Sequence, residues 1–269
     1  MSQPKGYVDA EYLQVAATLT EHVKRRSYAL MGIRPGDRVL DVGCGPGIDT
    51  LALAQLVGDS GQVVGVDCDR AMIAQADRAA LDANAGRCVK HVHSDACALP
   101  FESGEFDSCR SERLFEHLCH PEQALSEMVR VTKSGGSVVV VDSDWGSGSI
   151  DSPHTDIERR IVRLIAERRL NNPYSGRRLY RLFRQRGLGD LVVEGFCLPV
   201  LSHPLFRRLA QLDQTEEDAL SAGIVSPEEL TAWRAGLEQA EAERGFFASC
   251  NLILVAGTVP GGRSEGEAG

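Results

Sequence analysis

The chain has 269 residues, a formal net charge of −9, 43% hydrophobic residues and 25% charged residues. These values favour one globular α/β domain with additions over two full domains. The negative charge disfavours nucleic-acid binding, which usually requires a basic surface. No apolar run reaches the ~20 residues that span a bilayer, and residues 1–6 lack the layout of a secretory signal. The eight cysteines form no C-x-x-C pairs, so we expect a cytoplasmic protein with reduced thiols.

Hydrophobic periodicity predicts strands that alternate with helices along the first half of the chain. Apolar residues recur at helical spacing over residues 8–31, and Gly32 is a stop signal, so residues 1–32 are expected to form an N-terminal helical extension. Strands are expected near residues 37–43, 61–67, 87–93, 105–110 and 137–142. Helices are expected near residues 47–57, 70–83 and 121–132. Such alternation is typical of a parallel sheet with helices on both faces.

The second half departs from simple alternation. Helices are expected around residues 157–165 and 177–186, and strands over residues 191–198 and 246–259. The segment between the last two strands, approximately residues 202–244, is expected to be a helical lid over the active site, with packing on a sheet edge as the alternative. The main domain is then 33–260, and the polar tail 261–269 is expected to be disordered.

The most informative stretch is a strand at residues 38–42 that leads into Gly43, Gly45 and Gly47 and then into a helix. Glycine allows a backbone to turn sharply and to approach a ligand closely, and a strand, a glycine-rich turn and a helix form a nucleotide-binding crevice. The spacing is not that of a dinucleotide site, because Ile48 stands where the third glycine is required. Two carboxylates, Asp41 and Asp49, would repel a pyrophosphate. A ligand with positive charge and no phosphate, such as S-adenosylmethionine (SAM), fits better.

This segment resembles motif I of the class I SAM-dependent methyltransferases, and Asp41, Gly43, Gly45 and Gly47 fall on the pattern of that motif. The resemblance covers roughly residues 30–145 and is strongest to the branch that contains ubiquinone and menaquinone methyltransferases and many natural-product methyltransferases. It implies a Rossmann-like, doubly wound sheet of seven strands, mostly parallel with an antiparallel last strand, together with helical lid elements. It also implies SAM as the cofactor.

The resemblance further implies which residues contact that cofactor. Asp67 ends the second strand, 20 positions after Gly47, where a carboxylate accepts hydrogen bonds from both ribose hydroxyls. In the family, a residue at the position of Met72 packs on adenine, and an Asp at the position of Asp95 meets the adenine amino group. The residues expected to bind the cofactor are Asp41, Gly43, Cys44, Gly45, Gly47, Asp67, Cys68, Met72, Asp95, Ala96 and Ser111.

Candidate catalytic residues follow the fourth and fifth strands, because ligands gather beyond the carboxyl ends of parallel strands. His117 is a candidate general base, although a structural hydrogen bond is the alternative. Glu112 is expected to face the methionine part of the cofactor or the acceptor. Asp144 is a candidate base or cation partner and Trp145 a candidate pocket wall, unless the two belong to a loop stabilised by Asp turns. No metal site is expected, since no His/Cys set has the spacing of structural zinc.

Residues 159–186 contain ten arginines and one acid, a local charge of +9. They form either solvated helix faces or a basic rim that recruits an anionic acceptor or an acidic carrier protein. The expected function is methyl transfer from SAM to the O, N or C of a small molecule, a secondary metabolite or a quinone-like compound. The alternatives are a SAM-binding protein without methyl transfer and an RNA or protein methyltransferase. No nucleic-acid partner is expected, and the formation of a homo-oligomer stays open.

Overall fold

A computed structural model describes residues 18–261 of the chain. The expected N-terminal helical extension falls only partly within them: helix α2 spans Glu21–Met31 and ends at Gly32, whose φ is +64°. The remainder of that extension, residues 1–17, and residues 262–269 of the tail lie outside the described residues. No helix among residues 18–261 is long and apolar enough to span a membrane.

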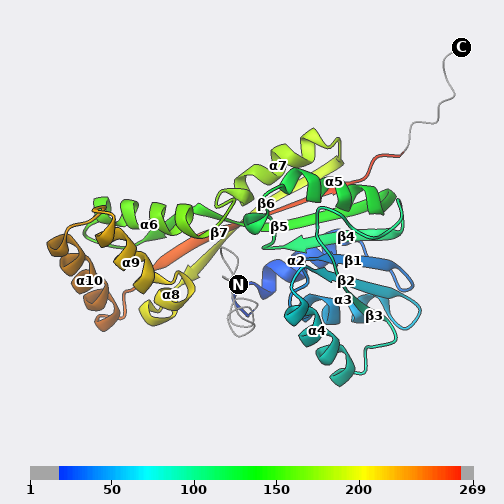
Figure 1. The fold of residues 1–269 in the computed structure, drawn as a ribbon, viewed down its shortest axis with the longest axis horizontal. Coiled ribbons are helices and arrows are strands. Elements are labelled where there is room, and N and C mark those ends of the chain that lie inside the picture. Colours follow the sequence, from blue (N-terminus) through cyan, green and yellow to red (C-terminus); the bar gives the residue numbers. More distant parts are fainter. Residues whose placement is uncertain (1–17, 262–269) are drawn as a thin grey trace, which may run out of the picture.

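Seven strands form one sheet in the order β3-β2-β1-β4-β5-β7-β6 (Figure 1). The first five are parallel, and β7 is antiparallel to both β5 and β6. The strands are β1 (Arg38–Val42), β2 (Gln62–Asp67), β3 (Val89–His93), β4 (Phe106–Glu112), β5 (Thr132–Ile150), β6 (Gly189–Val200) and β7 (Ala248–Thr258). This is the expected Rossmann-like sheet, and its order reverses between β1 and β4, the place where such folds bind ligands.

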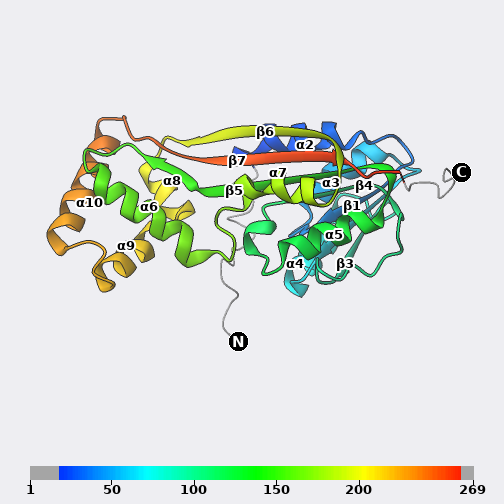
Figure 2. The same ribbon diagram turned by 90° about the horizontal axis from the view of Figure 1, so that it is seen from above.

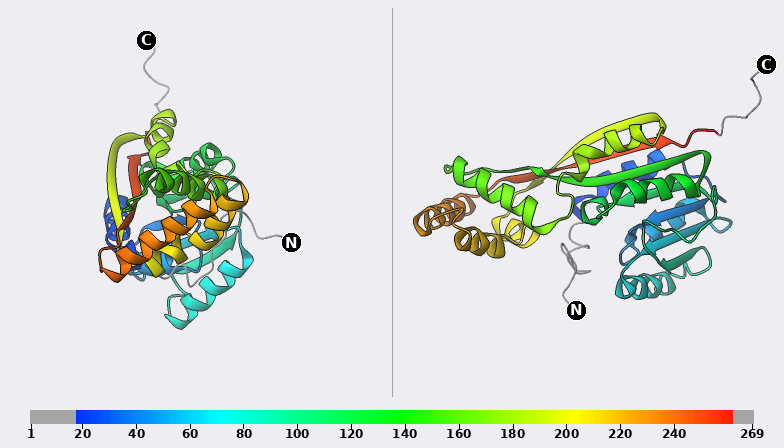
Figure 3. Two further views of the ribbon diagram at one scale, coloured as in Figure 1. Left: turned by 90° about the vertical axis from the view of Figure 1, so that its left-hand side faces the viewer. Right: turned by 45° about the horizontal axis from the view of Figure 1, so that its top comes forward.

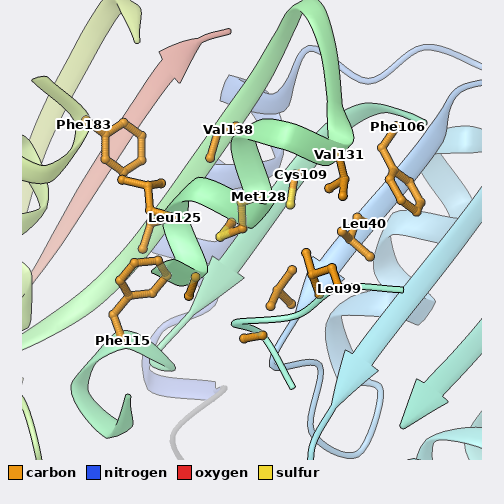
Figure 4. Close-up of a cluster of buried hydrophobic side chains, with 14 of the residues drawn as sticks. Leu40, Leu99, Phe106, Cys109, Phe115, Leu125, Met128, Val131, Val138 and Phe183 are labelled. Carbon is orange, nitrogen blue, oxygen red and sulfur yellow. The ribbon is translucent and has the colours of Figure 1, made fainter. Parts of the chain in front are cut away.

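Helices cover both faces of the sheet and enclose two apolar clusters. Helices α5 (Pro121–Val131) and α7 (Ser175–Gln185) pack on one face, where Leu125, Met128 and Phe183 meet Leu40 and Val138 (Figure 4). Helices α2, α3 (Ile48–Val57) and α4 (Arg70–Asp82) contribute to the cluster on the other face. The apolar positions that predicted these helices are therefore the positions that bury them.

Strand β5 is longer than the sequence predicts. The prediction ends it near residue 142, but it continues to Ile150 and pairs with β7 as far as Ala248, with a register shift between Asp144 and Ser149. The segment that contains Asp144 and Trp145 is therefore a strand and not a loop. Its Asp, Gly and Ser residues have low β-propensity, so local preference gave no sign of the extension. Strand β7, the expected antiparallel last strand, lies between β5 and β6, so the edge of the sheet is formed by β6.

The extended parts of β5, β6 and β7 lead to a helical module formed by α6 (Thr155–Arg169), α8 (His203–Leu209), α9 (Leu212–Ser221) and α10 (Pro227–Ala242). This module stands beyond the carboxyl ends of the parallel strands (Figures 1, 2 and 3). It has its own buried cluster, in which Ile150 of β5 meets Ile161, Leu212 and Trp233. The helices predicted between the last two strands are therefore present, and they share an apolar core with the end of the sheet.

Candidate cofactor and acceptor site

The glycine-rich loop between β1 and α3 is held by the neighbouring strand β2. The backbone N–H groups of Gly43 and Cys44 donate to the carbonyl of Val66 at 2.7 and 2.9 Å. Gly43 and Gly47 have φ values of +77° and +85°. A Cβ on Gly47 would lie 2.9 Å from the Cβ of Ala76 on α4, so the turn requires glycine for both conformation and space. Gly45 also has a positive φ, +51°.

Asp67 places a carboxylate directly against this loop. Its Oδ2 accepts from the backbone N–H of Gly45 at 2.9 Å, and its Oδ1 accepts from the N–H of Asp69 at 2.8 Å. Burial raises the pKa of Asp67, while these backbone donors oppose that shift. The acid that ends β2 and the loop that follows β1 are thus one hydrogen-bonded unit.

The other residues predicted to contact the cofactor lie around the same edge of the sheet. Met72 is buried on α4 at 5% exposure. Cys68 and Asp95 are exposed, and Asp95 accepts from the N–H of Cys97 at 2.8 Å. Ser111 is buried near the end of β4, beside Val42 of β1, and its hydroxyl has no partner among residues 18–261. The remaining two residues, Cys44 and Ala96, are both buried.

Asp41 and Asp49 belong to a network that the sequence analysis did not foresee. We call it the buried ion cluster; its members are Lys24, Tyr28, Asp41, Asp49, Arg110 and Glu112. Lys24 Nζ lies 2.7 Å from Asp49 Oδ2 and 2.9 Å from Glu112 Oε1. Arg110 reaches all three acids: Asp41 Oδ1 and Asp49 Oδ2 at 3.2 Å each and Glu112 Oε2 at 2.7 Å. The two acids that flank the loop are therefore partly neutralised by cations from distant parts of the chain.

The acids of this cluster differ in how well they are compensated. Burial alone would raise the pKa of Asp49, but Arg110 and Lys24 hold it below its ordinary value. For Asp41 burial prevails over the attraction of Arg110 and raises the pKa to about 7. Its Oδ2 has no partner among residues 18–261. Asp41 is thus the acid of the cluster that is least stabilised as an anion.

Two of the three catalytic candidates are held in ion pairs. Glu112 belongs to the buried ion cluster and therefore does not present a free carboxylate to an acceptor. Asp144 is 5% exposed, and its Oδ2 lies 2.7 Å from Nε of Arg177 on α7. Its Oδ1 is buried without a partner among the described residues. Asp144 is therefore paired with a cation of the protein itself, Arg177.

His117 lies in the short helix η1 (Phe115–His117) and keeps 29% of its side chain exposed. Its Nε2 is 3.4 Å from Oε1 of Glu116, a buried acid that the prediction had not selected. The other oxygen of Glu116 accepts from Nε1 of Trp145 at 2.7 Å. Burial opposes ionisation of Glu116, but its hydrogen bond with His117 keeps its pKa below the ordinary value. A buried carboxylate fixed by an indole thus stands behind a partly exposed imidazole.

Asp142 supports this arrangement from β5. Its Oδ2 accepts from the backbone N–H of Glu116 at 3.0 Å, and its pKa is raised well above the ordinary value by burial and by the charge of Glu116. The sequence indicates Asp144 and Trp145 as candidates. Only the fold shows that Asp142, Glu116 and Trp145 are neighbours.

The histidines near β3 have protein partners. Nε2 of His91 lies 3.0 Å from Oγ1 of Thr50, and its Nδ1 lies 2.9 Å from Asp77. Nε2 of His93 lies 3.0 Å from the carbonyl of Cys68. Across residues 18–261 no group of three or more His, Cys, Asp or Glu side chains is arranged to hold a metal ion.

Half of the ten arginines in residues 159–186 are paired with acids within the fold. These five arginines are Arg159, Arg160, Arg163, Arg168 and Arg177. Three others, Arg178, Arg181 and Arg184, are exposed on helix α7. The exposed basic surface therefore contains fewer arginines than the local charge of the sequence indicates.

Known proteins resemble this chain in both sequence and fold. A family model described as a methyltransferase domain matches residues 40–140. An uncharacterized 37.1 kDa protein in transposon TN4556 of Streptomyces fradiae is 33% identical over 255 residues, which are 92% of this chain and 70% of that protein. The ubiquinone/menaquinone biosynthesis C-methyltransferase UbiE of Ectopseudomonas mendocina is 37% identical over 119 residues, 44% of this chain and 46% of UbiE. The chain thus spans less than half the length of UbiE.

Solved structures share the fold over most of the chain. The YcgJ protein from Bacillus subtilis has a TM-score of 0.65 at 20% identity and covers 90% of this chain and 100% of its own. The [4+2]-cyclase SpnF has a TM-score of 0.55 at 18% identity and covers 97% and 89%. The chain belongs to the class I SAM-dependent methyltransferases.

The residues of this methyltransferase fit its cofactor, which is SAM. The loop that contains Gly43, Gly45 and Gly47 lies between the carboxyl ends of β1 and β2, and Asp67 is hydrogen-bonded to it. The unpartnered hydroxyl of Ser111 lies near the end of the adjacent strand β4. Buried polar atoms are normally hydrogen-bonded, so an orphaned group at this edge of the sheet is consistent with a polar ligand there.

Proposed function

We propose that this methyltransferase transfers the methyl group of SAM to a small-molecule acceptor, a secondary metabolite or a quinone-like compound. The observation that carries the proposal is the helical module. It stands beyond the carboxyl ends of the parallel strands, where acceptors of such folds bind, and its packed core around Trp233 allows it to serve as a wall of the acceptor site. A wall of this kind favours an enclosed acceptor over the surface of a macromolecule, as the predicted lid does.

Within this proposal His117 is the general base for an acceptor that must lose a proton. SAM supplies an electrophilic methyl group, so the protein has to orient the acceptor, exclude water and remove the proton. If Nε2 of His117 donates to Glu116, Nδ1 is the nitrogen that accepts the proton. Glu116 then stabilises the imidazolium that forms, and the indole of Trp145 keeps the Glu116 carboxylate in place. The ion pairs of Glu112 and Asp144 make those acids weaker candidates.

We further propose that the acceptor is anionic or is carried by an acidic protein. Arg178, Arg181 and Arg184 support it, because they are exposed on α7, the helix whose first turn adjoins Asp142 and Asp144. Reversing the charges of Arg181 and Arg184 should then raise KM and make it less dependent on salt. An unchanged KM would leave the acceptor neutral and would not affect the assignment of His117.

The test is incubation with methyl-labelled SAM and a cell extract separated into small molecules and macromolecules. Label in small organic products supports the proposal, and label confined to RNA or protein contradicts it. SAM binding without turnover would favour a non-methylating role, which the fold also allows, since the neighbour SpnF is a [4+2]-cyclase. With an acceptor in hand, His117→Asn should lower kcat ~10²-fold or more, whereas His120→Asn, three residues away and exposed, should not.

A further inference from the structure

The buried ion cluster adjoins the loop of the cofactor site, because two of its acids flank that loop. Its members come from four elements that meet there. Lys24 and Tyr28 belong to α2, Asp41 precedes the loop on β1, Asp49 lies in the first turn of α3, and Arg110 and Glu112 belong to β4. All three acids are at most 9% exposed. Charges in such a place interact more strongly with a nearby ligand than charges in water do.

The cations around the cluster compensate its three acids unequally. Three carboxylates share Lys24 and Arg110, and a further cation among the described residues, Arg113, has its Nε 3.6 Å from Oε1 of Glu112. Asp41 receives a single contact, at 3.2 Å, from a guanidinium that also serves Asp49 and Glu112. Its second oxygen is buried without a partner among residues 18–261. The ionisable groups that face Asp41 are Lys24 and Tyr28 from α2, Asp49 from α3, Arg110, Glu112 and Cys109 from β4, and Cys44 from the loop.

The cofactor and its product differ by one charge. SAM contains a sulfonium, whereas S-adenosylhomocysteine (SAH) contains a neutral thioether at the same position. A sulfonium bound at the loop adds a positive charge that compensates Asp41, whereas a thioether at the same position adds none. The acid whose ionisation responds to that difference is the least stabilised one, Asp41.

We propose that Asp41 discriminates between SAM and SAH by exchanging a proton. Binding of the sulfonium releases the Asp41 proton to solvent and leaves a carboxylate that stabilises the bound cation. When the methyl group has been transferred, Asp41 takes up a proton from solvent, and the neutral product loses that stabilisation. Asp41 is thus a specificity-determining residue that favours the cofactor over its product. The raised pKa of Asp41 is consistent with this exchange, because it lies near neutrality.

Titration calorimetry on the wild-type protein provides the test. SAM and SAH are titrated near pH 7 in two buffers whose ionisation enthalpies differ, so that the difference in heat gives the number of protons released. We expect SAM, and a non-reactive analogue with an ammonium in place of the sulfonium, to release about half a proton, and SAH to release none. The Kd of SAM should fall about threefold to tenfold between about pH 6 and about pH 8, since one pKa unit is worth a factor of ten.

Asp41→Asn identifies the source of the proton. It should abolish the release on SAM binding and bring the affinities for SAM and SAH closer, while Asp59→Asn, at an exposed acid, should leave both unchanged. Equal proton release for SAM and SAH, no release with either, or release that persists in Asp41→Asn would overturn the proposal. Those outcomes leave SAM as the cofactor, whereas a wild-type protein that binds neither ligand contradicts the cofactor as well. The wild-type measurement decides even if the variant does not fold.

Discussion

Replacing Lys24 by Met should destabilise the protein strongly, because it removes one of the two cations at the centre of the buried ion cluster. The ammonium lies 2.7 Å from Asp49 and 2.9 Å from Glu112, and the three side chains are 4–12% exposed. Methionine retains most of the aliphatic stem, so the loss of packing is small. Removal of one partner from a buried pair leaves an uncompensated charge and costs ~3–5 kcal/mol. We therefore expect the free energy of unfolding to fall by about 3 kcal/mol near neutral pH.

Helix α2 offers a matched control one residue away. Arg25 pairs with Glu21, but both side chains are more than half exposed, so Arg25→Met should change the free energy of unfolding by no more than about 0.5 kcal/mol. Urea unfolding followed by circular dichroism and by fluorescence of the two tryptophans measures both variants. A loss of less than about 1 kcal/mol for Lys24→Met, or an equal loss for Arg25→Met, would refute the reasoning.

The dependence on pH supplies an independent check. Lys24 and Arg110 keep the pKa of Asp49 below its ordinary value. A depressed folded-state pKa stabilises the protein above the unfolded pKa of about 3.9, and this stabilisation is lost as the pH falls toward the folded-state pKa. The difference in stability between the wild type and Lys24→Met should therefore be largest near neutrality and should shrink in acid.

Two further substitutions test the cofactor site itself. Gly47→Ala places a Cβ 2.9 Å from Ala76 at a φ of +85°. It should lower the melting temperature and weaken SAM binding, which calorimetry measures. An unchanged Kd would contradict the need for glycine there. Asp67→Ala removes the acceptor of the Gly45 N–H and should weaken SAM binding by ~1.5–3 kcal/mol, about tenfold to a hundredfold, for the loss of one hydrogen bond to a charged group; an unchanged Kd would show that the ribose is held elsewhere.

The parallel half of the sheet and its loop could be predicted because the signals are local. The strand before Gly43 and the acid that ends β2 are each recognisable within a few residues, and the alternation of strands and helices orders them. The extension of β5 to Ile150 could not be predicted in this way, since it depends on pairing with β7, about a hundred residues later in the chain. Polar residues such as Asp144 and Ser147 indicate a loop when they are considered without that partner.

The residues of the site also differ in whether local sequence signals or distant contacts determine their roles. Asp41 and Asp49 are adjacent to the glycines, so the sequence marks them as ligands for a cation, but their counter-ions are 69 and 25 residues away, at Arg110 and Lys24. Arg110 lies in a strand with six of its seven residues buried, and a lone arginine there carries no local signal of its partners. Likewise, His117 can be selected from its position after β4, whereas the support of Glu116 by Trp145 depends on the contact between η1 and β5.

The acids beside the loop still favour a cationic ligand although Lys24 and Arg110 are buried beside them, but the physical reason differs from the one in the sequence. The sequence analysis favours a cationic ligand because two acids flank the loop. In the structure these acids are paired with Lys24 and Arg110, but the acid that precedes the loop, Asp41, keeps one oxygen without a partner among residues 18–261. A site with an acid that is incompletely compensated still prefers a sulfonium over a pyrophosphate. Lys24→Met removes one of the cations that compensate these acids, so the folded variant should favour SAM over SAH more strongly than the wild type does. Calorimetry with both ligands measures the ratio of the Kd of SAH to the Kd of SAM. A ratio smaller than that of the wild type would contradict the argument.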